Sequence, residues 1–181
     1  MSTSVDVKTG TWAIDVTHTD IGFTVRHLVS KVRGSFEKFE GTIVTADDIT
    51  ASTVSVKVDL SSINTGTPDR DAHLRSADFF EVETHPEMTF VSTGIVAKGD
   101  NNFVITGDLT IKGVTKSVDL ATEFLGEGAD PWGGTRIGIE ATTSISRKEF
   151  GIDFNVPLDG DKLMVGDKIS IVINAEAVLQ A

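Results

Sequence analysis

The sequence predicts an all-β protein, an antiparallel barrel of about eight strands with one short helical insertion. Its composition favours sheet, because 20 Val, 15 Ile and 22 Thr stand against only 9 Leu. Apolar residues recur at every second position, and no long stretch shows the helical period. Long strands that follow one another also favour a closed barrel, because closure removes exposed edges.

Each expected strand is a run of alternating apolar and polar residues bounded by turn residues. Val54, Val56 and Val58 alternate with polar residues, for example, and so share one face. The expected strands lie, in order, near residues 11–16, 20–29, 33–45, 54–60, 87–98, 103–112, 114–125, 137–145 and 169–179.

Two local features complete this outline. The odd spacing of Phe36 and Phe39 predicts a bulge, since strict alternation cannot place both side chains inside. Pro68 and Asp69 form a helix start signal, which predicts a helix over Asp69–Ala77. A shorter helical turn is expected near residues 47–48.

The clearest local unit is a hairpin around Lys112 and Gly113, whose pairing fits a primed two-residue turn. The expected register pairs Ile111 with Val114 and makes both strands agree on one apolar face. Gly107 falls on that inward face, where its missing side chain is expected to leave space.

Length and charge narrow the function classes. The 181 residues are expected to form a single barrel domain, 1–181, in which residues 1–10 are a flexible tail. The formal net charge of −11 argues against nucleic acid or an anionic membrane surface as the main partner. Without a long apolar run we expect no stable membrane insertion, and without a signal-peptide pattern we expect a cytoplasmic location.

Candidate catalytic and metal-binding groups are few. The sequence has no Cys, and its His residues lack the i, i+4 spacing of a zinc helix. Nucleophile, phosphate-loop and dinucleotide motifs are absent. We therefore expect no metal, no cofactor and no catalytic residue. Two alternatives stay open: a lipid-modifying enzyme that uses His73 with Asp71 or a metal on His18, and an interaction module with a solid barrel.

The most concentrated polar segment runs from Thr65 to Phe80. Arg70, Asp71 and His73 lie within one or two helical turns of each other. They form either a polar rim at the barrel mouth, which binds a head group, or a network that pins an insertion to the barrel. We expect Arg147 to tie a strand end rather than to contact a ligand.

Eight stretches of the chain together carry a family resemblance. They are Trp12–Asp15, His18–Leu28, Val32–Phe36, Ile63–Gly66, Arg70–Phe80, Pro86–Phe90, Gly107–Lys116 and Ser146–Gly151. In this order they resemble the YceI-like family of lipid-binding proteins. The resemblance implies a lipocalin-like barrel with a long apolar cavity that binds a polyisoprenoid, such as a quinone tail or a polyprenyl phosphate, or another fatty amphiphile.

The resemblance also implies transport or sequestration without catalysis, and a part in stress response. Many members carry an export signal, which this N-terminus lacks. A homodimer is left open.

The cavity lining is expected to come mainly from large apolar side chains. The predicted lining residues are Phe23, Val25, Phe36, Phe39, Leu74, Phe79, Phe80, Met88, Phe90, Phe103, Leu109 and Ile139. His27 is expected to supply a polar contact in or near the cavity. The head group is expected at the mouth, near Arg70 and His73.

Overall fold

The computed structural model describes residues 6–156 and 164–181, and it confirms the all-β prediction. The strands are β1 (Gly10–Ile14), β2 (Asp20–His27), β3 (Ser30–Phe36), β4 (Phe39–Thr45), β5 (Thr53–Asp59), β6 (Ile63–Asn64), β7 (Glu87–Gly99), β8 (Asn102–Ile111), β9 (Val114–Ala129), β10 (Thr135–Ser146) and β11 (Val165–Leu179). The helical elements are α1 (Pro68–Arg75) and the short 3-10 turns η1 (Val16–His18), η2 (Ile49–Ala51), η3 (Leu60–Ser62) and η4 (Arg147–Phe150).

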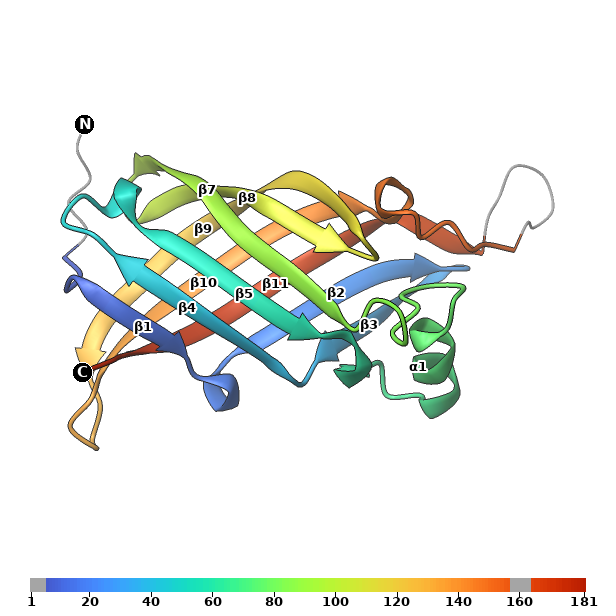
Figure 1. The fold of residues 1–181 in the computed structure, drawn as a ribbon, viewed down its shortest axis with the longest axis horizontal. Helices are drawn as coiled ribbons and strands as arrows, with labels where there is room; N and C mark the ends of the chain where they lie inside the picture. The colour runs from blue at the N-terminus through green and yellow to red at the C-terminus, as the bar shows by residue number, and fades with distance from the viewer. Residues whose placement is uncertain (1–5, 157–163) are drawn as a thin grey trace.

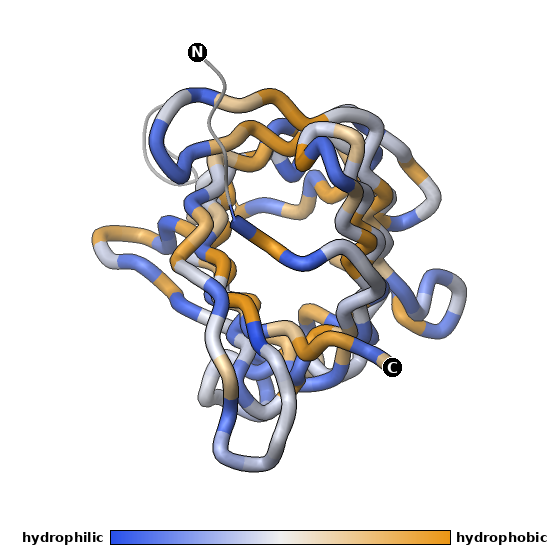
Figure 2. Tube along the Cα trace, turned by 90° about the vertical axis from the view of Figure 1, so that its left-hand side faces the viewer, coloured by the Kyte–Doolittle hydropathy of each residue, from blue (hydrophilic) through white to orange (hydrophobic). Residues whose placement is uncertain are grey.

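Eight antiparallel strands close into a barrel in the order β1-β4-β5-β7-β8-β9-β10-β11, because β1 also pairs with β11. The end-on trace forms a ring (Figure 2). The long strand β11 pairs with β1 near its C-terminus and with β2 along its N-terminal part. From there β2, β3 and β6 extend the sheet beyond the barrel toward α1 (Figure 1).

The β8–β9 hairpin has the predicted register, with Ile111 opposite Val114. Lys112 and Gly113 have φ values of 52° and 77°, as a type I′ turn requires. Gly107 does face inward, but the prediction of free space there is wrong. A Cβ atom at Gly107 would overlap the ring of Phe90, so that ring already fills the position.

The single strand predicted over 33–45 is in fact two strands with a corner between them, and the predicted bulge is wrong. β3 ends at Phe36 and β4 begins at Phe39. The Ser62 hydroxyl accepts hydrogen bonds from the backbone N–H groups of Glu37 and Lys38, at 3.1 and 2.9 Å. This contact with η3 satisfies the backbone N–H groups of the corner. The local sequence alone did not reveal the corner, because Ser62 lies 24 residues beyond Lys38 along the chain.

The predicted helix exists with slightly different bounds, Pro68–Arg75. Pro68 occupies the first turn, where its missing N–H costs nothing. The helix ends where the backbone N–H and the hydroxyl of Ser76 both donate to the His73 carbonyl. The short turn expected near residues 47–48 is η2, which begins after Asp48.

The barrel interior is filled unevenly along its length. One end is closed by a buried cluster of Trp12, Ile43, Ile137 and Ala177, in which Trp12 is completely buried. Val7 packs against this cluster and the Lys8 carbonyl accepts from Thr45, so the described part of the 1–10 segment is tied to the barrel.

Among the residues described, no helix has the length and hydropathy to cross a bilayer.

Candidate ligand-binding cavity

A cavity of about 190 Å³ opens at the end of the barrel that carries α1. Its walls come mainly from β2, β3, β11, α1 and the segment around η4, with single residues from β6, β7, β8 and β10. The apolar residues predicted from the sequence that line it are Phe23, Val25, Phe36, Leu74, Phe79, Phe80 and Met88. His27, Arg70 and His73 line it as well.

The other predicted lining residues, Phe39, Phe90, Phe103, Leu109 and Ile139, do not line this cavity. Phe90 and Leu109 are buried in a core cluster that continues from the cavity wall, since it also contains Phe79 and Phe150. Phe103 is buried near the start of β8, away from the cavity, and Ile139 packs on the Trp12 cluster. Phe39 is half-buried and packs against the core cluster that contains Phe36. The side-chain period identifies inward positions, but it does not tell which part of a lumen is filled.

The sequence did not predict several of the residues that line the cavity. They include Ile21, Val32, Ile111, Ile145, Phe150, Ile152, Phe154, Ile169 and Ile171. Ile169 and Ile171 lie on a strand whose alternating face the sequence does predict. The alternation of Phe150, Ile152 and Phe154 is also visible in the sequence, and it was the signal that could have identified this wall.

Arg147 forms the polar part of the same wall. Only 4% of its surface is exposed, and burial lowers the pKa of its guanidinium. It donates to four main-chain carbonyls, those of Gly166, Ile152, Phe154 and Val165, at 2.8–3.2 Å. As expected, Arg147 ties strand ends together.

The polar segment before α1 is held through Thr65. The buried Asp71 carboxylate accepts from the backbone N–H of Thr65 at 2.9 Å and from its hydroxyl. Arg70 donates from Nε and Nη2 to the hydroxyl and carbonyl of Thr65, both at 2.7 Å. The network therefore pins the start of α1, while Arg70 still reaches the cavity.

His73 stands in an aromatic cluster at the cavity wall. Its ring centroid lies 5.1 Å from that of Phe79 and 4.9 Å from that of Phe154, both nearly edge-on. Its Nε2 atom lies 2.9 Å from a carboxylate oxygen of Asp78. The pairing of His73 with Asp71 that the enzyme alternative requires is not present, because Asp71 is bonded to Thr65.

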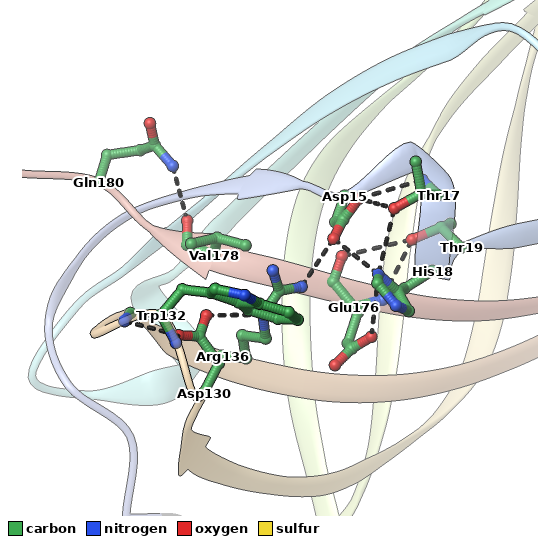
Figure 3. Close-up of polar contacts among 11 residues, drawn as sticks. Asp15, Thr17, His18, Thr19, Asp130, Trp132, Arg136, Glu176, Val178 and Gln180 are labelled. Atoms are coloured by element: carbon green, nitrogen blue, oxygen red, sulfur yellow. Dashed lines mark hydrogen bonds and ion pairs between the residues drawn. The ribbon is translucent and has the colours of Figure 1, made fainter.

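A second polar cluster gathers around Arg136 (Figure 3). It includes the turn between β9 and β10, which lies at the end of the barrel away from α1 (Figure 1). Arg136 bridges Asp15 and Asp130, with N–O distances of 2.7 and 2.8 Å. The Arg136 guanidinium, helped by His18 and Thr17, holds the pKa of the Asp15 carboxyl well below its usual range. The Gly134 backbone N–H and then Arg136 lower the pKa of Asp130.

His18 belongs to this cluster, with Nδ1 2.9 Å from Asp15. In the part of the chain that the structure describes, no three acidic or His side chains are grouped so as to hold a metal ion. The Asp15 carboxylate is instead bound to Arg136, so the cluster acts as an ion-pair clamp between β10 and the end of β1.

Comparison with known proteins agrees with this architecture. Residues 12–177 match the YceI-like domain. The chain belongs to the YceI-like family. A UPF0312 protein of Azotobacter vinelandii is 39% identical over 165 residues, which cover 90% of this chain and 83% of that protein.

Solved structures share this barrel fold. Burkholderia cenocepacia BcnA matches with a TM-score of 0.80 and 22% identity, covering 90% of this chain and 98% of that chain. A polyisoprenoid binding domain from Saccharophagus degradans, implicated in plant cell wall breakdown, matches with a TM-score of 0.72 and 17% identity. That match covers 96% of this chain and 100% of the domain.

Proposed function

We propose that this protein binds a long apolar chain of the polyisoprenoid type in the cavity beside α1, and carries or sequesters it without converting it. The observation that carries the proposal is the lining, which combines apolar side chains with two Arg and two His and, among the described residues, contains no carboxylate. Membership of the YceI-like family and likeness to a polyisoprenoid binding domain support it. The driving force is burial of apolar surface, at about 25 cal/mol per Å².

The size of the cavity limits how the chain is held. At about 190 Å³ it is smaller than the roughly 300–1,000 Å³ typical of ligand sites. It is only somewhat larger than a cavity of about 150 Å³ that holds one benzene. We therefore expect a short stretch of chain to fit the cavity as it stands, and a longer one to displace half-buried side chains such as Leu74 and Phe80.

We further propose that the head group lies at the mouth, near Arg70 and His27. Among the described residues, Arg70 Nη1 and the His27 ring have no hydrogen-bond partner. Both are therefore available to an acceptor such as a phosphate oxygen or a quinone carbonyl. Binding is favoured over catalysis because His73 and Asp71 are each engaged elsewhere. The cytoplasmic location, the stress-response role and the homodimer stay predictions.

The central test is mass spectrometry of an organic extract from protein purified without detergent. We expect a long-chain isoprenoid at about one per chain. Absence of such a lipid, together with no uptake of added farnesol, contradicts the proposal.

Matched variants localise the site. Val25→Phe adds bulk inside the cavity, whereas Val96→Phe adds the same bulk at an outer position that is 53% exposed. Only Val25→Phe should reduce farnesol binding. Arg70→Gln should weaken farnesyl phosphate binding more than farnesol binding. Equal effects on both ligands contradict the head-group assignment but leave the cavity proposal intact.

A further inference from the structure

The turn between β2 and β3 projects at the same end of the molecule as α1 (Figure 1), and α1 borders the cavity. Val25, His27 and Val32 of these strands line the cavity. The alternate residues therefore point away from the cavity. The tip of this hairpin thus stands beside the cavity mouth, and its outer face is exposed to solvent.

The outer face of the hairpin is cationic in an acidic protein. Residues 21–36 contain Arg26, Lys31 and Arg33 but none of the 27 Asp and Glu residues of the chain. All three side chains are exposed, and none forms an ion pair with another described residue. Arg26 lies directly opposite Lys31 in the register, an arrangement of like charges that is unfavourable unless an anion relieves it.

The tip itself is apolar and strained. Val29 is 98% exposed and Leu28 is 44% exposed. Leu28 has a φ of 53°, in the left-handed region that normally favours glycine. Strain and exposed apolar surface at one turn point to a functional contact, since both are costly to the isolated protein.

We propose that the β2–β3 hairpin docks on the surface of an anionic lipid bilayer. Leu28 and Val29 enter the boundary between head groups and acyl chains, and Arg26, Lys31 and Arg33 contact lipid phosphates. The geometry requires only shallow, reversible contact and no spanning segment. Docking does not depend on what fills the cavity. Docking also places the cavity mouth next to the membrane, where a ligand could be exchanged; this consequence rests on the proposed function.

The net charge of −11 opposes this docking less than the sequence alone indicates. At physiological salt, exposed charges are screened beyond about 8 Å, so the local charge of the hairpin decides its contacts. A nucleic acid would also attract the three cations, but it offers no apolar layer for Leu28 and Val29. The combination of both features therefore favours a bilayer.

The test is cosedimentation of the full chain with vesicles of phosphatidylcholine, with and without phosphatidylglycerol. We expect binding to the anionic vesicles only, weakened by added salt. Arg26→Gln/Lys31→Gln should weaken binding by roughly 30-fold, from about 1 kcal/mol for each basic residue near the surface. Val29→Asp should also reduce binding.

The matched control is Lys8→Gln/Lys98→Gln, which removes two exposed lysines away from the hairpin. This control should bind vesicles as the unmodified chain does, and circular dichroism verifies that all variants are folded. The proposal is overturned by absence of binding to anionic vesicles, by equal binding to neutral ones, or by equal effects of the hairpin and control substitutions. Because no isoprenoid enters this assay, its outcome is separate from that of the cavity proposal.

Discussion

At the scale of single residues, buried groups with several partners have the greatest influence on the cavity wall. Arg147 is the clearest case, because one guanidinium satisfies four carbonyls from two separate segments. Unsatisfied buried acceptors are costly, at about 1–3 kcal/mol each. The cavity wall therefore depends on a cation that need not touch ligand.

Replacement of Arg147 by Met should lower the free energy of unfolding by about 3 kcal/mol or more, because it leaves buried carbonyls without donors. Urea denaturation measures this change. Lys148→Met, at an exposed neighbouring position, is the control and should change stability little. Equal losses in the two variants would contradict the structural role of Arg147.

Gly107→Ala should destabilise the protein by roughly 1–3 kcal/mol, because the new methyl group overpacks a filled core. It would overlap the Phe90 ring and lie 2.7 Å from the Val91 carbonyl oxygen. Gly94→Ala is the matched control, since nothing lies within 4 Å of its Cβ position. Thermal unfolding compares the two variants. In a Phe90→Leu background, Gly107→Ala should cost less stability than in the unmodified chain. An unchanged loss of stability would contradict the clash with Phe90.

At the scale of elements, short Asp-initiated turns end three strands of the barrel. Asp15, Asp48 and Asp59 each accept a hydrogen bond from the backbone N–H two residues later, at 2.9–3.0 Å. These side chains satisfy backbone donors locally and redirect the chain. The β2–β3 turn differs, because it has neither an Asp cap nor a glycine at its positive φ.

Leu28→Gly should raise stability by about 1 kcal/mol, because it removes the cost of a bulky residue at positive φ. The measurement is the midpoint of thermal unfolding. Val29→Gly is the control: Val29 is not among the residues with positive φ in the described chain, so glycine there should not stabilise. A fall in the midpoint for Leu28→Gly would contradict the assignment of strain.

At the scale of the whole molecule, the barrel has one solid end and one hollow end. The Trp12 cluster and the Asp15–Arg136–Asp130 ion pairs close the solid end, and α1 borders the hollow one. The two ends therefore have separate tasks, closure at one and ligand contact at the other.

The ion-pair clamp predicts a pH dependence of stability. The folded-state pKa of Asp15 is depressed from its ordinary value of 3.8, so its carboxylate stabilises the fold above about pH 4 and loses this effect as the pH falls. Asp15→Asn should therefore be less stable than the unmodified chain at neutral pH, and the gap should narrow below pH 4. Unfolding midpoints across pH measure this, with the exposed Asp108→Asn as control; a gap that does not change with pH would contradict it.

The hollow end predicts a limit to chain length. Each buried methylene contributes about 0.8 kcal/mol, so affinity should rise about fourfold per carbon while the chain remains inside. Binding of a series of linear isoprenoid alcohols, measured by displacement of a fluorescent probe, should show this rise and then a plateau. A steady rise through the longest members would show that the cavity extends further than about 190 Å³.

The sequence by itself determined the strand faces, the β8–β9 register, the start of α1 and ten of the residues beside the cavity. These features follow from side-chain alternation and turn residues, which act over a few positions. Only the tertiary structure decided that Phe90 occupies the space beside Gly107, that Asp71 bonds to Thr65 and His73 to Asp78, and that Trp12 fills one end of the lumen. Packing between distant strands sets these contacts, because an inward-facing position becomes core or cavity wall according to the side chains that reach it from across the barrel.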